Sequence, residues 1–141
     1  MENNTIIKIE QLEKSFGALH VLKGINLEIH QGEVVCIIGA SGSGKSTLLR
    51  CATFLETLDD GSLSYQGQEV VHSENGRAVY GNKAQIKQAM GSFGLVFQNF
   101  NLFPHFSVLK NITDAPIRVQ KRPKEQVEAE ARELLKKMGL A

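Results

Sequence analysis

Apolar and polar residues alternate along the first third of the chain, which is the pattern of β-strands. Residues 6–9, 19–22 and 25–29 predict three strands, and the alternation is clearest in the last of them, Ile-Asn-Leu-Glu-Ile. The apolar, β-branched run at residues 34–38 predicts a further strand, and a helix-like spacing follows from residue 46 to residue 55. A strand, a glycine-rich turn and a helix are therefore expected in that order around residues 34–55.

Turn signals separate shorter elements in the middle of the chain. Glycine-containing turns at 59–61 and 66–67 enclose a predicted strand at 62–65. Residues 70–71 and 78–80 flank Asn75-Gly76, so this stretch predicts a hairpin with Asn-Gly at its tip. Residues 83–90 are predicted to be helical, and the apolar run 93–97 predicts a strand that ends at Gln98.

The pattern becomes helical in the last third of the chain. An irregular, aromatic stretch at 99–106 comes first, and a helical pattern then runs from Val108 with an interruption expected at Pro116. Pro123 is expected to open a final helix with a solvated, mixed-charge face. Its apolar positions have helical spacing: Val127, Ala131, Leu134, Leu135 and Met138.

Composition narrows the class of protein. The chain has 141 residues, of which 42% are hydrophobic and 22% charged, so it can bury a core as one domain or as part of a larger one. A net charge of +1 gives no support for a nucleic-acid partner. No apolar run approaches the roughly 20 residues that span a bilayer. Cys36 and Cys51 are expected to be small core residues in a reducing, cytoplasmic compartment, and the histidines show no metal-ligand spacing.

The most specific feature of the sequence is the run at 39–46, which fits the pattern G-x-x-x-x-G-K-[ST] of a phosphate-binding (Walker A) loop. It consists of Gly39, Ala40, Ser41, Gly42, Ser43, Gly44, Lys45 and Ser46. Glycines let a backbone take up positive φ and approach phosphates closely, and a helix that starts here presents unpaired N–H groups to the anion. The alternative is a glycine-rich turn that only joins a strand to a helix.

Two further positions of the loop have an expected role in binding a nucleoside triphosphate and Mg²⁺. Lys45 would reach the outer phosphates as a compact charge, and the hydroxyl of Ser46 would be a Mg²⁺ ligand. Several charge-assisted hydrogen bonds of about 1.5–3 kcal/mol each would give micromolar affinity before the base contributes. The sequence therefore predicts a nucleoside-triphosphate-binding protein.

With β structure before this loop and Phe-Gly-Leu-Val-Phe-Gln at 93–98 after it, the chain resembles the ATP-binding subunit of an ABC transporter. Within that family it looks most like the ATPases of bacterial polar amino-acid importers. The narrower similarity rests on residues 39–51 and on Phe-Gln-Asn-Phe-Asn-Leu-Phe-Pro-His at 97–105. The resemblance implies an α/β fold, a P-loop NTPase core whose mixed sheet joins an N-terminal antiparallel part to parallel strands around the loop. It also implies two domains, an ATP-binding core at 1–98 and, at 99–141, a Q-loop with an incomplete helical subdomain.

The resemblance also implies further site residues. Phe16 matches the aromatic residue that stacks on adenine, although it could be a core aromatic. Val21 matches a small apolar residue beside the ribose and base, and a plain core valine fits equally well. Thr47 matches the hydroxyl that touches the α-phosphate, or it could serve only the first turn of the helix.

Gln98 matches the Q-loop glutamine of the family, which ligates Mg²⁺, orients the attacking water and is the catalytic residue expected here. In the family, the region after it receives a short helix from the membrane permease subunit. That region holds Phe100, Leu102, Phe103, Pro104 and Phe106, and exposed aromatic residues fit a docking surface. The alternative is a loop folded onto the helical subdomain.

Three family elements are missing from these residues: the Leu-Ser-Gly-Gly-Gln signature, the acidic strand end and the switch histidine. The chain is therefore expected to be the N-terminal portion of a longer protein, which binds nucleotide weakly and without turnover on its own. The parent is expected to be a transport-coupled ATPase that pairs head to tail with a second copy. It would lie at the inner face of the cell membrane and contact the membrane only through its permease partners.

Three other interpretations of the motif stay open. A soluble ABC-type ATPase of DNA repair or translation usually brings tandem cassettes or long insertions, and neither is present here. A small-molecule kinase or GTPase would place the loop nearer the N-terminus, and the guanine-reading Asn-Lys-x-Asp motif is absent. A non-catalytic nucleotide-binding module would describe these residues but not the parent protein.

Overall fold

The computed structural model of the chain describes residues 4–140. Residues 1–3 and 141, which belong to the two predicted domains, lie outside this part. Contacts within the chain divide it into two compact units, residues 1–95 and 96–141, and each unit is described here by itself. The assignment of residues 1–98 and 99–141 as functional domains stays a prediction.

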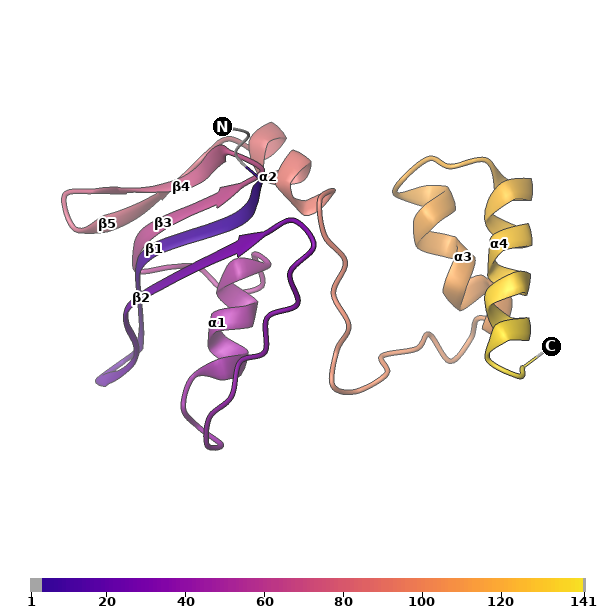
Figure 1. Cartoon of the computed structure of the whole chain (residues 1–141), viewed down its shortest axis with the longest axis horizontal. Helices are drawn as coiled ribbons and strands as arrows, with labels where there is room; N and C mark the ends of the chain where they lie inside the picture. The colour runs from indigo at the N-terminus through magenta and orange to yellow at the C-terminus, as the bar shows by residue number, and fades with distance from the viewer. Residues whose placement is uncertain (1–3, 141) are drawn as a thin grey trace. The chain divides into compact units, whose positions relative to one another are not determined.

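The first unit is built on one antiparallel sheet (Figure 1). Its five strands lie in the order β2-β1-β3-β4-β5, and every pair of neighbours is antiparallel. The strands are β1 (Thr5–Phe16), β2 (Leu19–His30), β3 (Asp60–Tyr65), β4 (Gln68–Glu74) and β5 (Arg77–Tyr80). Together with the helices described below they confirm the α/β class and the antiparallel N-terminal part.

The two strands predicted at 19–22 and 25–29 are one strand, β2. Gly24 lies between them with φ of +63°, where the β1–β2 register shifts between the Leu12–Ile25 and Glu13–Lys23 pairs. This irregularity absorbs the glycine as a bulge, so pairing continues past a residue that normally weakens a strand. The prediction of two separate strands at 19–22 and 25–29 was wrong because the glycine bends the strand without ending it.

The predicted hairpin and the helix after it are confirmed. Asn75 and Gly76 have φ of +52° and +76°, and positive φ at both central residues is what a type I′ turn requires. Helix α2 (Lys83–Met90) begins with a capping box, in which the side chain of Asn82 accepts from the N–H of Gln85 at 2.9 Å. The reciprocal bond runs from the N–H of Asn82 to Oε1 of Gln85, at 3.0 Å.

Helix α1 (Lys45–Ala52) covers one face of the sheet (Figure 1). The helix contributes Leu48, Cys51 and Ala52 to a buried apolar cluster. From the strands this cluster takes Ile9, Leu12, Leu22, Leu63, Tyr65, Val70 and Val71. The hydroxyl of Tyr65 donates to the carbonyl of Ala52. Burial raises the pKa of the Cys51 thiol to about 11, as expected for a core cysteine.

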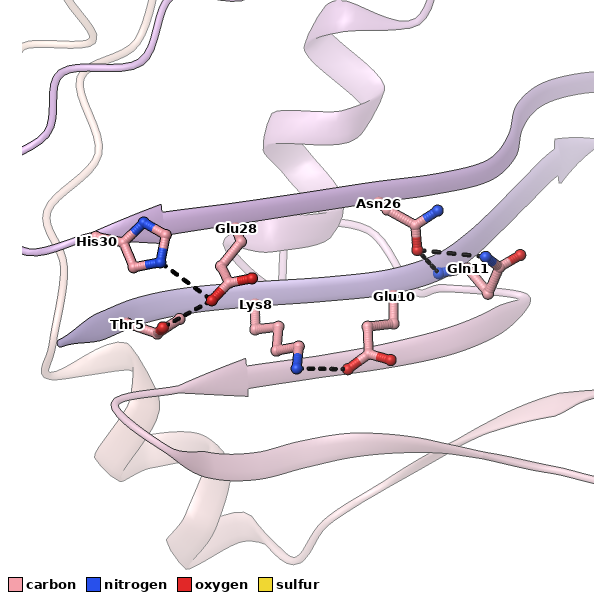
Figure 2. A network of polar contacts seen from close by, with 7 residues as sticks. All are labelled: Thr5, Lys8, Glu10, Gln11, Asn26, Glu28 and His30. Carbon is pink, nitrogen blue, oxygen red and sulfur yellow. Dashed lines mark hydrogen bonds and ion pairs between the residues drawn. The ribbon is translucent and has the colours of Figure 1, made fainter. Parts of the chain in front are cut away.

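The opposite face of β1 and β2 is polar and open to solvent (Figure 2). Glu28 accepts from the hydroxyl of Thr5 at 2.8 Å and lies 3.1 Å from Nε2 of His30. On β1, the ammonium of Lys8 lies 3.2 Å from Glu10. Water screens exposed contacts of this kind, so they contribute little and the buried face carries most of the stability.

Two predicted strands are not formed. Residues 34–38 and 93–97 are irregular, and Val34, Ile38 and Val96 are each 92% exposed. A strand exists only when a neighbouring strand takes up its N–H and C=O groups, and no strand of residues 4–140 pairs with either segment. Residues 4–140 therefore do not form the parallel part of the predicted sheet. Cys36, in the first segment, is exposed rather than in the core.

The second unit contains two packed helices, α3 (Val108–Arg118) and α4 (Lys124–Lys137). Thr113 of α3 and Val127 and Ala131 of α4 are buried. Pro116 lies inside α3, so the predicted interruption there was wrong. The proline removes only one helical hydrogen bond, and the helix tolerates this loss because it ends two residues later, at Arg118. In residues 4–140 no helix is both long enough and apolar enough to cross a membrane.

Candidate functional site

The predicted phosphate-binding loop leads directly into α1, which begins at Lys45. Gly44 is the N-cap and has φ of +97°. A Cβ at this position would lie 3.1 Å from Cδ2 of Leu22 and 3.1 Å from Cγ1 of Val21. Glycine is favoured here for two reasons: its φ is one that L side chains rarely adopt, and the side chains of β2 crowd the place of a Cβ.

Lys45 folds back over the loop that precedes it. Its ammonium donates to the carbonyl of Gly39, and a Cβ on Gly39 would lie only 2.7 Å from Oγ of Ser43. The N–H of Ser43 donates to the carbonyl of Ala40 at 3.1 Å and closes a turn. The loop is thus compact, and the lysine ammonium is bound to a backbone oxygen of the loop, a contact that a phosphate oxygen could replace.

The N-terminus of α1 is open to an anion. Within the described residues no side chain caps this helix, and its first turn contains no acidic residue. The first helical bond runs from the N–H of Leu48 to the carbonyl of Gly44, at 2.9 Å, which leaves the N–H groups before Leu48 outside the helical ladder. The positive end of the helix dipole lies here as well, so the residues fit a triphosphate group.

Ser46 and Thr47 occupy the first turn of α1. Ser46 is exposed and Thr47 half-buried. A hydroxyl oxygen is a suitable ligand for Mg²⁺, which also keeps phosphate oxygens and water in its coordination shell. The position of Ser46 therefore fits a Mg²⁺ ion bound together with a triphosphate, and the expected roles of both hydroxyl groups remain predictions.

Strand β2 brings Val21 to the phosphate-binding loop. Val21 is half-buried, and its side chain is among the atoms closest to Gly44. The structure thus accommodates both interpretations of Val21, since a residue that packs on the loop can also line the edge of a nucleotide site.

Phe16 ends β1 and pairs with Leu19 at the tip of the β1–β2 hairpin. Its side chain is 46% exposed, which makes it a surface ring rather than a core aromatic residue. An exposed ring face can stack on a base. Stacking on adenine remains a prediction.

Lys14, two residues before Phe16, is not singled out by the sequence but stands out in the structure. Its side chain is only 8% exposed and lies 3.5 Å from both Glu56 and Asp59. The signal in the sequence was the alternation of Leu12, Lys14 and Phe16, which places a lysine on the buried face of the strand. Lysine is rarely buried unless it is paired, so this position requires an explanation.

Gln98 belongs to the second unit and is exposed. It follows an irregular segment instead of the predicted strand. The structure brings together Val21 and residues 39–47 in the first unit; a role of Gln98 in the same site remains a prediction.

An apolar cleft of about 470 Å³ lies within the second unit. It is lined by side chains of the predicted docking segment and of both helices, among them Phe103, Pro104, Phe106, Ile112 and Leu135. Phe100 is 91% exposed. Exposed apolar area of this kind usually marks an interaction site.

Asn111 of α3 fixes the turn that carries these aromatic residues. Its Oδ1 accepts from the N–H of Phe103 at 2.8 Å. Its Nδ2 lies within hydrogen-bond distance of the carbonyls of Phe103, Phe106 and Ser107, at 3.2, 3.4 and 3.0 Å. The turn from Phe103 to Ser107 is therefore braced by the Asn111 side chain and by the backbone hydrogen bond from Phe106 to Phe103, in the absence of regular secondary structure.

The fold and the loop together define a nucleotide-binding α/β protein of the P-loop type. The ABC transporter family model matches residues 22–141, and the chain belongs to this family. The resemblance seen in the sequence is thereby confirmed.

The chain is also similar to ATP-binding proteins of amino-acid transport. The chain is 46% identical over 138 residues to the arginine transport ATP-binding protein ArgV of Corynebacterium glutamicum, covering 96% of this chain and 54% of the relative. It is 47% identical over 135 residues to the L-cystine transport system ATP-binding protein TcyN of Escherichia coli, covering 96% and 53%. The chain thus spans about half the length of these curated relatives.

A solved structure supports the fold. The dimeric structure of MJ0796, a bacterial ABC transporter cassette, superimposes with a TM-score of 0.75 at 29% identity, over 93% of this chain and 56% of that one. The likeness to an ABC cassette confirms the α/β P-loop fold class predicted from the sequence.

Proposed function

We propose that the protein is the ATP-binding and hydrolysing subunit of an ABC importer that energises the uptake of a polar amino acid. The observation that carries this proposal is the uncapped N-terminus of α1, with Lys45 folded over a glycine loop in a chain of the ABC transporter family. The solute class rests on the relatives, which are named as arginine and L-cystine transport ATP-binding proteins.

In this proposal the residues of the first unit bind Mg·ATP. The loop from Gly39 to Lys45 would hold the phosphates through backbone N–H groups and the lysine ammonium. Ser46 would contribute a hydroxyl to Mg²⁺, and Thr47 would touch the α-phosphate. When bound, the ion neutralises phosphate charge. Gln98 would complete the Mg²⁺ site, orient water and serve as the catalytic residue.

The partners follow from the same proposal. A second copy would pair head to tail, and the dimeric cassette structure among the relatives supports a dimer. Permease subunits would dock on the segment 100–106, and the apolar cleft braced by Asn111 supports an apolar partner there. The protein would then work at the inner face of the membrane through these subunits.

Replacing Lys45 by Ala tests the proposal. Loss of a charge-assisted hydrogen bond worth about 1.5–3 kcal/mol should weaken Mg·ATP binding at least about tenfold, while the circular dichroism spectrum stays unchanged. Isothermal titration calorimetry on the wild type and the variant measures this. Arg50→Ala is the matched control, because it removes a positive charge from the last turn of the same helix. Equal ATP affinity in K45A and wild type would show that the loop does not bind the phosphates.

A further inference from the structure

We propose that Lys14 is a positioning residue for the nucleotide base: it holds the ring of Phe16 so that one face of the ring stays free for adenine. This inference rests on the proposed function. It concerns a residue that neither the family pattern stated above nor the loop itself assigns, and four observations in the first unit carry it.

The first observation is the geometry of the pair. The ammonium of Lys14 lies over the Phe16 ring, 5.2 Å from its centroid. An ammonium within about 6 Å of a ring centroid is attracted by the negative potential of the ring face. Because the lysine occupies one face of the ring, only the other face is available to a base.

The second observation is that Lys14 is itself held in place. Glu56 and Asp59, in the segment between α1 and β3, each lie 3.5 Å from its ammonium. Asp59 is fixed in turn, since its Oδ2 accepts from the N–H of Ser15 at 2.6 Å and its own N–H donates to the carbonyl of Glu13 at 2.9 Å. Lysine side chains are usually mobile, but the side chain of Lys14 is fixed by two carboxylates, one of which is itself bound to the end of β1.

The third observation is the place of this cluster relative to the loop. Lys14 pairs with Leu22 across the β1–β2 hairpin, and Leu22 is one of the two residues whose side chains lie closest to Gly44. The hairpin that carries Phe16 is therefore packed on the start of α1. The strand pair β1–β2 would therefore position both the loop that binds the phosphates and the ring that contacts the base.

The fourth observation is the exposure of the two side chains. Phe16 is 46% exposed at the end of a strand, where a ring without a contact would be free to rotate, while Lys14 is 8% exposed. A buried charge beneath a surface ring is a costly arrangement, and a simple core position would be filled by an apolar side chain. Ordering the ring before binding reduces the entropy that the nucleotide has to overcome.

The test compares the wild-type protein with its Lys14→Met variant. Methionine has a side chain of similar length without the charge. ATP affinity should fall about three- to tenfold, the range for losing one pre-ordered side chain, and affinity for inorganic tripolyphosphate should stay unchanged because it has no base. Lys14→Arg should retain most of the ATP affinity. In the double variant K14M/F16A, ATP should bind as in F16A alone, because both changes remove the same contact.

A second measurement does not depend on nucleotide. In nucleotide-free protein, the ring current of Phe16 should shift the ε-methylene NMR signals of Lys14, and F16A should abolish the shift. Glu56→Gln loosens Lys14 without altering it, so a smaller loss of ATP affinity should follow even if K14M does not fold. Absence of the ring-current shift, equal losses for ATP and tripolyphosphate, or additive effects of K14M and F16A would overturn the inference. A wild type that shows the shift but binds no ATP would instead contradict the proposed function.

Discussion

Gly42 and Gly44 both have positive φ, +82° and +97°, but their surroundings differ. Nothing lies within 4 Å of the place where a Cβ on Gly42 would stand, whereas Val21 and Leu22 crowd the same place at Gly44. A side chain at Gly42 would therefore meet backbone strain alone, whereas a side chain at Gly44 would meet both backbone strain and crowding by β2. They form a matched pair of positions for testing why the motif carries glycine at its sixth place.

Gly44→Ala should destabilise the chain more than Gly42→Ala. In G42A the alanine costs about 1 kcal/mol because it must adopt a left-handed backbone. In G44A the new methyl group also pushes against β2, and overpacking adds about 1–3 kcal/mol. Urea unfolding monitored by circular dichroism gives both values. Equal stability of the two variants would mean that β2 yields to the side chain and does not exclude it.

At the scale of elements, local signals were the reliable part of the sequence. The Asn75-Gly76 turn, the helix at 83–90 and a helix directly after the phosphate-binding loop were predictable because neighbouring residues determine them. The strands at 34–38 and 93–97 were not, because a strand depends on partners far away in the chain and an apolar run carries no information about them. Lys14 was missed for a related reason, since its partners lie in a distant loop.

At the end of β2, the protonation of His30 is coupled to two neighbouring carboxylates. The imidazole of His30 lies 3.1 Å from Glu28 on the polar face of the sheet (Figure 2). It also lies 2.7 Å from Glu33, so it links the turn after the strand to that face. The hydrogen bond to Glu33, followed by the charges of both carboxylates, raises the pKa of His30 above its usual 6.5. The hydrogen bond from Thr5, with smaller help from His30, lowers the pKa of Glu28.

His30→Gln should therefore reduce stability in a pH-dependent way. Because the pKa of His30 is raised on folding, its stabilisation is fully present below about pH 6.5 and is lost as the pH rises through the folded-state value. The difference in Tm between wild type and H30Q should be larger at pH 6 than at pH 8.5. His72→Gln is the control, because His72 lies near one carboxylate, Glu74, at 3.3 Å. A Tm difference for H30Q that does not change with pH would contradict this assignment.

At the scale of the whole molecule, the first unit combines a well-packed face with an uncovered apolar segment. The core between α1 and the sheet is closed, yet Val34 and Ile38 are almost fully exposed a few residues away. Residues 34–38 also carry backbone groups that no strand of the described residues takes up. An extended apolar segment with free backbone groups is a template for pairing with another chain.

The 141-residue chain should therefore self-associate as its concentration rises. Replacing Val34 and Ile38 by Lys should suppress association, because charges on such a segment block pairing. Leu19→Lys with Val119→Lys makes the same change in charge at exposed apolar positions elsewhere and should have little effect. Light scattering over a concentration series measures all three proteins. A wild type that stays monomeric at high concentration would show that the segment is covered in solution.

The two cysteines differ in exposure, so the native chain can be labelled selectively with a fluorescent dye. Cys36 is exposed just before the phosphate-binding loop, while burial inside the core and a raised pKa of about 11 keep Cys51 unreactive at neutral pH. A maleimide dye added to the native protein would therefore attach at one place without any mutation. Its emission would report the binding of a nucleotide from a position three residues before Gly39.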